Sequence, residues 1–245
     1  MPYNPFGDYA KRGYLRNVLA AKRAARVKAY EHASFLLHVE DAVALLAHAG
    51  PPITYEDVLK VHRTLFIDFY PWAGQDRFQL RVSPHPHRGS IHFEQSVEIR
   101  RAMQTALNMG NEADQMKAQP GAVLSLMAWA HPFLDGNGRT ILLTHGELCR
   151  RAGISIAWEL SDKSAYLDAL GRDLEDPSSG CLDAYLRPLI GPARQATQLI
   201  RTYRSMPGLK GYDDPVQRRP KTTGRFAPNT ETGAETKELP RRRRP

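Results

Sequence analysis

The chain has few cysteines and no long apolar run. Only two cysteines, Cys149 and Cys181, occur among 245 residues, which excludes a disulfide-rich scaffold and suits a reducing compartment. No stretch of about eighteen apolar residues occurs, so we expect no membrane span. The first eight residues lack an apolar core, which argues against a secretory signal peptide. We therefore expect a protein of the cytoplasm with one sizeable core.

The positive charge is concentrated at the carboxyl end. From residue 206 the composition changes to Pro, Gly, Thr and charged residues, which is typical of disorder. This tail holds ten basic and five acidic residues, so it carries +5 of the net +8 and leaves +3 for the rest. The basic balance therefore does not indicate a nucleic-acid-binding fold. For the final Arg241–Arg244 run, three interpretations stay open: a solubilising end, a recognition signal for secretion, and a contact with nucleic acid or a membrane surface.

We expect an amino-terminal arm at residues 1–13, a folded domain at 14–205 and a disordered basic tail at 206–245. Apolar spacing predicts a mainly helical domain. The expected helices are Leu15–Ala49, Tyr55–Phe66, Ile99–Met109, Ala122–Ala130, Arg139–Arg151, Ala165–Leu174 and Leu182–Tyr203. Thr54 and Asp57 have the spacing of a capping box. His62 lies among apolar residues, so we interpret it as a core histidine rather than a ligand.

The residues that lead into the first predicted helix, and its first half, are basic. Because no aromatic residues interleave with these cations, we interpret them as a solvated face rather than a nucleic-acid surface. The set is Lys11, Arg12, Arg16, Lys22, Arg23, Arg26 and Lys28.

Two short strands are expected at Phe78–Val82 and Ser90–Phe93, with a turn-rich tip between them. The histidines of this region, His85, His87 and His92, lack a convincing fourth ligand for zinc.

The ten residues His131–Thr140 have the sequence HPFLDGNGRT and contain four kinds of functional group. A histidine can take a proton near neutral pH, and the carboxylate of Asp135 is an oxygen ligand that suits Mg²⁺. Gly-Asn-Gly can turn its N–H groups inward around an anion, and Arg139 suits phosphate oxygens. The run leads into the predicted helix Arg139–Arg151, whose amino terminus favours phosphate. These are the parts needed to move a phosphate-containing group from a nucleotide to a hydroxyl.

The run resembles the signature of the Fic family, His-x-Phe-x-Asp/Glu-Gly-Asn-Gly/Lys-Arg-x-x-Arg. Seven of its eight specified positions match, at His131, Phe133, Asp135, Gly136, Asn137, Gly138 and Arg139. The last position is Leu142 instead of arginine. The segment from Ile53 to Gly74 is also similar to a Fic segment, and the resemblance extends from about Tyr14 to about Leu189.

The resemblance implies a Fic-type helical bundle with a small β-hairpin flap over the active site. It implies transfer of AMP from ATP to a Tyr, Thr or Ser hydroxyl of a target protein. His131 would be the catalytic base, Asp135 would hold Mg²⁺, and Phe133 would pack the loop into the core. Phosphates would be bound by Gly136, Asn137, Gly138 and Arg139. The target would dock on the flap by strand addition, along Leu80, Arg81 and Val82 or along Ser90, Ile91, His92 and Phe93.

Leu142 leaves alternatives open. Most nucleotidyl-transferring relatives place there an arginine that binds the terminal phosphate, so Arg150, Arg151 or a flap group is expected to take that role here. Doc-type relatives also lack it and transfer the γ-phosphate, although they usually have lysine where this chain has Gly138. A non-catalytic binding module is the third alternative. The family's inhibitory glutamate motif is not recognisable, since Ser155–Glu159 and Ser90–Glu94 have only its spacing. The resemblance therefore leaves open a separate antitoxin chain as the inhibitor. It implies that the protein is a bacterial toxin or an effector secreted into a target cell.

Overall fold

The computed structural model describes residues 5–6, 14–82, 87–88 and 91–206. In this part of the chain most residues are helical and the strands are short. The longer helices are α2 (Ala24–His48), α3 (Tyr55–Phe66), α4 (Ile99–Asn111), α6 (Pro120–Ala130), α7 (Asn137–Arg151), α8 (Lys163–Glu175) and α10 (Ala196–Ser205). The shorter ones are α5 (Ala113–Ala118), α9 (Cys181–Leu186), and the 3₁₀ turns η1 (Ser96–Glu98), η2 (Trp158–Leu160) and η3 (Arg187–Leu189). A bundle of helices with a small hairpin confirms the expected fold class.

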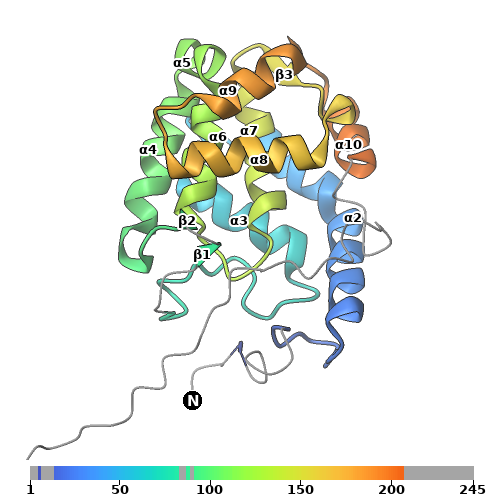
Figure 1. Ribbon diagram of the computed structural model, residues 1–245. Helices are drawn as coiled ribbons and strands as arrows, with labels where there is room; N and C mark the ends of the chain where they lie inside the picture. The colour runs from blue at the N-terminus through green and yellow to red at the C-terminus, as the bar shows by residue number, and fades with distance from the viewer. Residues whose placement is uncertain (1–4, 7–13, 83–86, 89–90, 207–245) are drawn as a thin grey trace, which may run out of the picture.

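The helices α6 and α7 lie in the middle of the molecule (Figure 1). Helix α6 packs against α4, α9 and α7, while α7 packs against α3 and α2. Most of α7 is buried, including Ile141, Leu143 and Leu148. The loop between these two helices, residues 131–136, is therefore supported by the core on both sides. It lies at the same end of the bundle as the flap strands.

Helix α3 begins and ends as the sequence predicts. The Thr54 hydroxyl accepts the N–H of Asp57 at 3.3 Å, and the Asp57 carboxylate accepts the N–H of Thr54 at 3.0 Å. This reciprocal capping box satisfies two donors at the helix start. Helix α6 is capped from a distance, because the Asp183 carboxylate accepts the N–H groups of Gly121 at 2.6 Å and Ala122 at 3.1 Å.

The first predicted helix starts later than expected. Helix α2 begins at Ala24, and Leu15–Arg23 is not helical. The Asn17 side chain bonds to the carbonyls of Leu15 and Ala21 and to the N–H of Ala21, and Ala20 has φ of +48°. Side-chain bonds of this kind compete with helical ones, which explains the error.

The last predicted helix, Leu182–Tyr203, does not form as one continuous helix. The stretch Leu182–Tyr203 contains α9, η3, the strand β4 (Ile190–Pro192) and α10. Pro188 and Pro192 cannot donate helical hydrogen bonds, so the chain extends here. Strand β4 pairs antiparallel with β3 (Ile154–Ile156), with Ser155 opposite Gly191. Ser155 belongs to this small sheet, whose strand β3 contacts α7.

The flap is a hairpin of β1 (His87–Arg88) and β2 (Ile91–His92), paired antiparallel. The second strand confirms part of the expected Ser90–Phe93 strand, and Ser90 itself lies outside the described residues. The strand expected at Phe78–Val82 does not form. Asp76 and Gln79 exchange hydrogen bonds at 2.7 and 2.9 Å and close a turn instead.

Within the described ranges, no helix has the length and apolar character needed to cross a lipid bilayer. Most of the amino-terminal arm and the tail from residue 207 lie outside these ranges, so the predictions made for them stay predictions.

Candidate active site

His131 ends helix α6 in a left-handed conformation, with φ of +42° and ψ of 59°. Its ring stacks on Phe93, which follows β2, with ring centroids 4.1 Å apart. Burial, followed by the nearby Arg77 cation, lowers the pKa of His131 to about 3. The imidazole is therefore neutral at neutral pH, which is the protonation state from which a general base acts.

The loop is held by a second histidine from α3. The Gly74 N–H donates to Nδ1 of His62 at 2.8 Å, so Nε2 carries the proton and donates to the Asp135 carbonyl at 3.0 Å. The His62 ring stacks on Phe133, with centroids 3.7 Å apart and planes 11° apart. Burial lowers the pKa of His62 to about 3, which keeps this neutral tautomer. His62 is thus the expected core histidine, and it also supports the loop.

Gly136 is required where it stands. It caps α7 with φ of +79°, and a Cβ there would lie 2.6 Å from Cε2 of Phe66 and 3.1 Å from Nε2 of His62. Gly138 is different, because a Cβ there would meet no atom within 4 Å. Open space therefore adjoins the first turn of α7 at this residue.

Asn137 fastens the loop through its side chain. Its Oδ1 accepts the Phe133 N–H at 2.8 Å, and its Nδ2 donates to the Phe133 carbonyl at 2.7 Å. The amide is buried, so a contribution of Asn137 to phosphate binding falls to its main-chain N–H. The N–H groups of Asn137, Gly138 and Arg139 belong to the first turn of α7, where no helical carbonyl can accept them. Together with the helix dipole they favour an anion.

Asp135 is ionised and already paired with a cation. Its Oδ1 accepts the Gly136 N–H at 2.8 Å, and its Oδ2 lies 2.6 Å from the ammonium of Lys28 on α2. Burial raises the pKa of Asp135, but the Lys28 and Arg139 cations outweigh burial and hold this pKa well below its ordinary range.

A single carboxylate of this kind fits a Mg²⁺ ion that arrives with nucleotide phosphates, because such ions need only one or two protein carboxylates. No cluster of three or more candidate metal ligands occurs in the described part of the chain. Asp135 would therefore share the ion with the nucleotide rather than belong to a site made only of protein groups.

Arg139 forms an ion pair with Glu31 of α2, a fully buried residue whose carbonyl also accepts from Nη1 of Arg139 at 3.3 Å. The guanidinium lies over the Phe66 ring, 4.7 Å from its centroid. Glu31 also contacts Lys28 at 2.8 Å. Two cations, Lys28 and Arg139, and two carboxylates, Glu31 and Asp135, thus form a charge-balanced cluster beside the first turn of α7.

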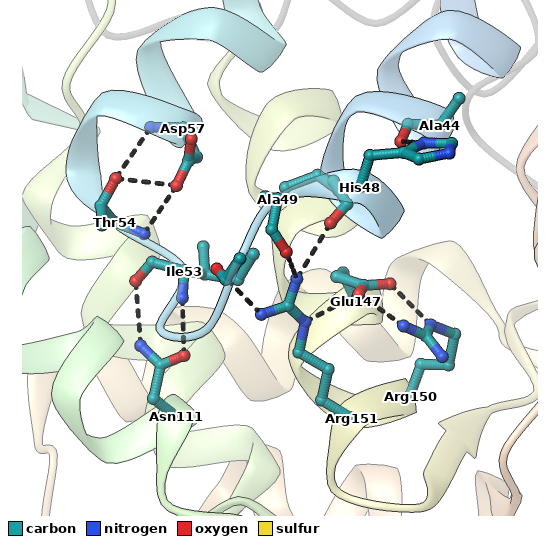
Figure 2. Close-up of polar contacts among 12 residues, drawn as sticks. Ala44, His48, Ala49, Ile53, Thr54, Asp57, Asn111, Glu147, Arg150 and Arg151 are labelled. Atoms are coloured by element: carbon teal, nitrogen blue, oxygen red, sulfur yellow. Dashed lines mark hydrogen bonds and ion pairs between the residues drawn. The ribbon is translucent and has the colours of Figure 1, made fainter.

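Arg150 and Arg151 lie at the far end of α7 and do not reach this cluster. Arg151 follows Arg139 by twelve residues, which is about 18 Å along a helix. Both arginines bind Glu147, and Arg151 also donates to the carbonyls of Leu46 and Ala49 (Figure 2). The prediction that either one replaces an arginine at position 142 is therefore wrong, and Leu142 itself is buried.

The predicted docking residues separate into two groups. Ile91 and His92 form β2, and Phe93 follows directly against His131. Leu80, Arg81 and Val82 lie in and after the turn, and the Val82 N–H donates to the Arg77 carbonyl at 2.8 Å. Only the first group contains a strand, so the docking prediction stays a prediction for β2 and the adjoining Phe93.

Three residues of this site were missed by the sequence analysis: Lys28, Glu31 and Arg77. Lys28 was assigned to a solvated face, yet its ammonium contacts the loop. The i, i+3 spacing of Lys28 and Glu31 was a signal, since it places both on one side of a helix. Arg77 carried no signal beyond its place after the Gly74 turn.

The family model of the Fic/DOC family matches residues 52–148. The chain is 27% identical over 160 residues to protein adenylyltransferase VbhT of Bartonella schoenbuchensis, which covers 64% of this chain and 33% of that protein. It thus spans about a third of the length of that relative.

Two solved structures have a similar fold. One is BepC, a VirB-translocated effector of Bartonella tribocorum with bound AMPPNP, at a TM-score of 0.60 and 18% identity over 76% of this chain and 96% of that chain. The other is the N-terminal Fic domain of a putative cell filamentation protein of Bartonella quintana with bound ADP. Its TM-score is 0.60 and its sequence identity is 20%, and the match covers 78% of this chain and 96% of that chain. These likenesses concern the fold. The segment that matches the Fic/DOC family, residues 52–148, includes α3, the loop and most of α7.

Proposed function

We propose that this chain transfers AMP from ATP to a Ser, Thr or Tyr hydroxyl of a target protein. The observation that carries the proposal is the loop between α6 and α7. There a neutral histidine, an ionised carboxylate, the first turn of a helix and an arginine adjoin one another. The name of the relative from Bartonella schoenbuchensis, a protein adenylyltransferase, supports the same reaction.

In the proposed reaction, His131 takes the proton of the target hydroxyl. The freed oxygen attacks the α-phosphorus, a new P–O bond forms, and the bond to the β-phosphate breaks, so that pyrophosphate leaves. The N–H groups at Gly138 and Arg139 hold the phosphates, and the Arg139 cation balances charge on the leaving group. Asp135 would hold Mg²⁺, which offsets phosphate charge when bound.

Labelled ATP tests this directly. With Mg²⁺ and a lysate of potential targets, α-labelled ATP should label a protein, and His131→Ala should abolish the label. The matched control is His48→Ala, because His48 is exposed at the end of α2, away from the loop. Label that arrives only from γ-labelled ATP would replace the proposal by the Doc-like alternative of phosphate transfer.

The kinase alternative is supported by Leu142. A buried leucine cannot bind the terminal phosphate as the arginine of nucleotidyl-transferring relatives does. A non-catalytic binding module is the other alternative. Calorimetry separates it from both enzymes, since such a module would show no affinity for ATP with Mg²⁺.

A role as a bacterial toxin or translocated effector is part of the proposal. Its support is that similar solved chains are described as VirB-translocated effectors.

An antitoxin partner is proposed on the lack of a recognisable inhibitory motif in the sequence. Co-purification of this chain with the product of a neighbouring small gene tests the partner, and loss of translocation on deletion of residues 207–245 tests the tail as a secretion signal.

A further inference from the structure

Arg77 is fully buried and precedes the flap. Its guanidinium donates three hydrogen bonds, each to a main-chain carbonyl. Nε donates to His131 at 2.7 Å, and Nη2 donates to Ala130 at 3.3 Å and to Glu94 at 2.7 Å. The Arg77 main-chain N–H donates to the Pro132 carbonyl at 2.8 Å. One residue therefore binds three consecutive carbonyls, at positions 130–132, where α6 enters the loop.

These bonds fix the backbone that orients His131. The last carbonyls of a helix have no partner within it, and a cation is favoured there by the helix dipole. His131 has a left-handed φ of +42°, which residues other than glycine adopt only where the surroundings hold them. The hydrogen bond from the Arg77 guanidinium to the His131 carbonyl stabilises this conformation.

The same guanidinium connects the flap to the histidine. Glu94, whose carbonyl binds Arg77, donates its N–H to the Trp129 carbonyl at 3.1 Å. Trp129 Nε1 in turn donates to the His92 carbonyl at 3.1 Å. Between them, Phe93 stacks on the His131 ring. The return segment of the flap, residues 92–94, is thus laid along the end of α6, with Arg77 at the junction.

A buried guanidinium is costly when no carboxylate binds it. The hydrogen bonds of Arg77 go to carbonyls, and its Nη1 has no acceptor within the described ranges. Filling space at this position would need no charge. The charge and the forked geometry therefore indicate a role in holding the loop and the flap together.

We propose that Arg77 is a positioning residue that holds His131 and the return segment of the flap at a fixed separation. A target segment docked on β2 would then present its hydroxyl to the imidazole without a search. The inference rests on the proposed transfer reaction for its activity readout, and Arg77 would act through the backbone of His131 and Glu94.

The variants Arg77→Lys and Arg77→Gln test the assignment, with Arg101→Gln as the control. Arg101 is an exposed arginine on α4 that pairs with Glu98. We expect kcat to fall by about 100-fold in both Arg77 variants, the size of effect that a misplaced reacting group produces. The affinity for ADP should stay within about twofold of wild type, because the turn that binds phosphate is not touched. The control should match wild type in both measurements.

A second readout is the titration of His131 itself, followed by NMR in the nucleotide-free protein. The charged groups that act on the imidazole are Arg77, which lowers its pKa, and Asp135, which raises it; the Ala128 carbonyl also raises it. Phe93 covers one ring face without a charge. Arg77→Gln should therefore raise the pKa of His131, whereas Arg77→Lys should keep it low and still be slow.

Two results would overturn the assignment. One is a lower melting temperature with unchanged turnover per folded molecule and an unchanged His131 titration, which would make Arg77 a structural residue only. The other is a loss of ADP affinity as large as the loss of turnover. If wild-type protein transfers nothing, the transfer proposal fails, while the titration of Arg77→Gln still decides whether Arg77 acts on His131.

Discussion

The two glycines that flank Asn137 have opposite steric surroundings. Gly136 has a left-handed φ and the Phe66 ring against it, whereas Gly138 faces open space. We expect Gly136→Ala to lower stability by about 2–4 kcal/mol, from left-handed strain and overpacking together.

Gly138→Ala is the matched change. Alanine fits the first turn of a helix, so stability should not fall, but a methyl group would enter the space proposed for phosphate and weaken ATP binding. Urea unfolding and calorimetry on both variants measure the contrast. Equal losses of stability would contradict the different surroundings of the two residues.

The four-charge cluster at the loop gives a second pair of variants. Lys28 and Arg139 contribute +2, and Glu31 and Asp135 contribute −2, so the cluster sums to zero. Lys28→Ala makes the sum −1 and should weaken ATP binding, whereas Glu31→Gln makes it +1 and should strengthen it. Shifts of about fivefold to tenfold in Kd, or about 1 kcal/mol, are expected.

Lys22→Ala is the control for that pair, since Lys22 is exposed just before the same helix. Calorimetry at low and high salt provides the comparison, and both shifts should shrink as salt rises. Tighter binding by Lys28→Ala would show instead that the ammonium competes for Asp135.

At the scale of elements, α3 carries the histidine that supports the loop, and its start depends on the Thr54 cap. Thr54→Ala should cost about 1 kcal/mol of stability, because the capping box is lost. ATP affinity of the folded protein should not change, since His62 lies two turns further along the helix. Thr105→Ala, at an exposed position on α4, is the control. A cost equal to that of the control would mean that the box contributes nothing.

The elements also show where local sequence was sufficient. Helix α3 follows from its own cap and apolar spacing, and the loop from His131 to Arg139 follows from its motif. The first turns of the predicted Leu15–Ala49 helix failed because Asn17 bonds its own neighbouring backbone. The contacts that Lys28 makes with Asp135, Glu31 with Arg139, and Arg77 with His131 could not be predicted. Each joins segments more than fifty residues apart that only the fold brings together.

At the scale of the whole molecule, buried neutral histidines connect stability to pH. Burial lowers the pKa of His62 to about 3 and that of His145 to about 4, against about 6.5 in an unfolded chain. Below pH 6.5 the unfolded state binds protons that the folded state refuses, so stability is complete above that pH and is lost as the pH falls toward 4. With His131, whose pKa is also lowered to about 3, three such groups give a slope of up to about 4.1 kcal/mol per pH unit.

Urea unfolding between pH 7.5 and 4.5 measures this slope. His145→Gln is the informative variant, because its amide can still donate to the Pro120 carbonyl that His145 contacts at 2.8 Å. The variant should be less pH-dependent than wild type by about one proton. Stability that does not change between pH 6.5 and 5 would contradict the neutral state of the buried histidines.

The most direct test of the central claim is the intact mass of a target protein after incubation with this chain, ATP and Mg²⁺. Transfer of AMP to a hydroxyl predicts a gain of about 329 Da on the target, absent when His131 is replaced by alanine. A gain of about 80 Da would mean that phosphate moves instead, and an unchanged mass for every target tested, despite measurable ATP binding, would contradict transfer altogether.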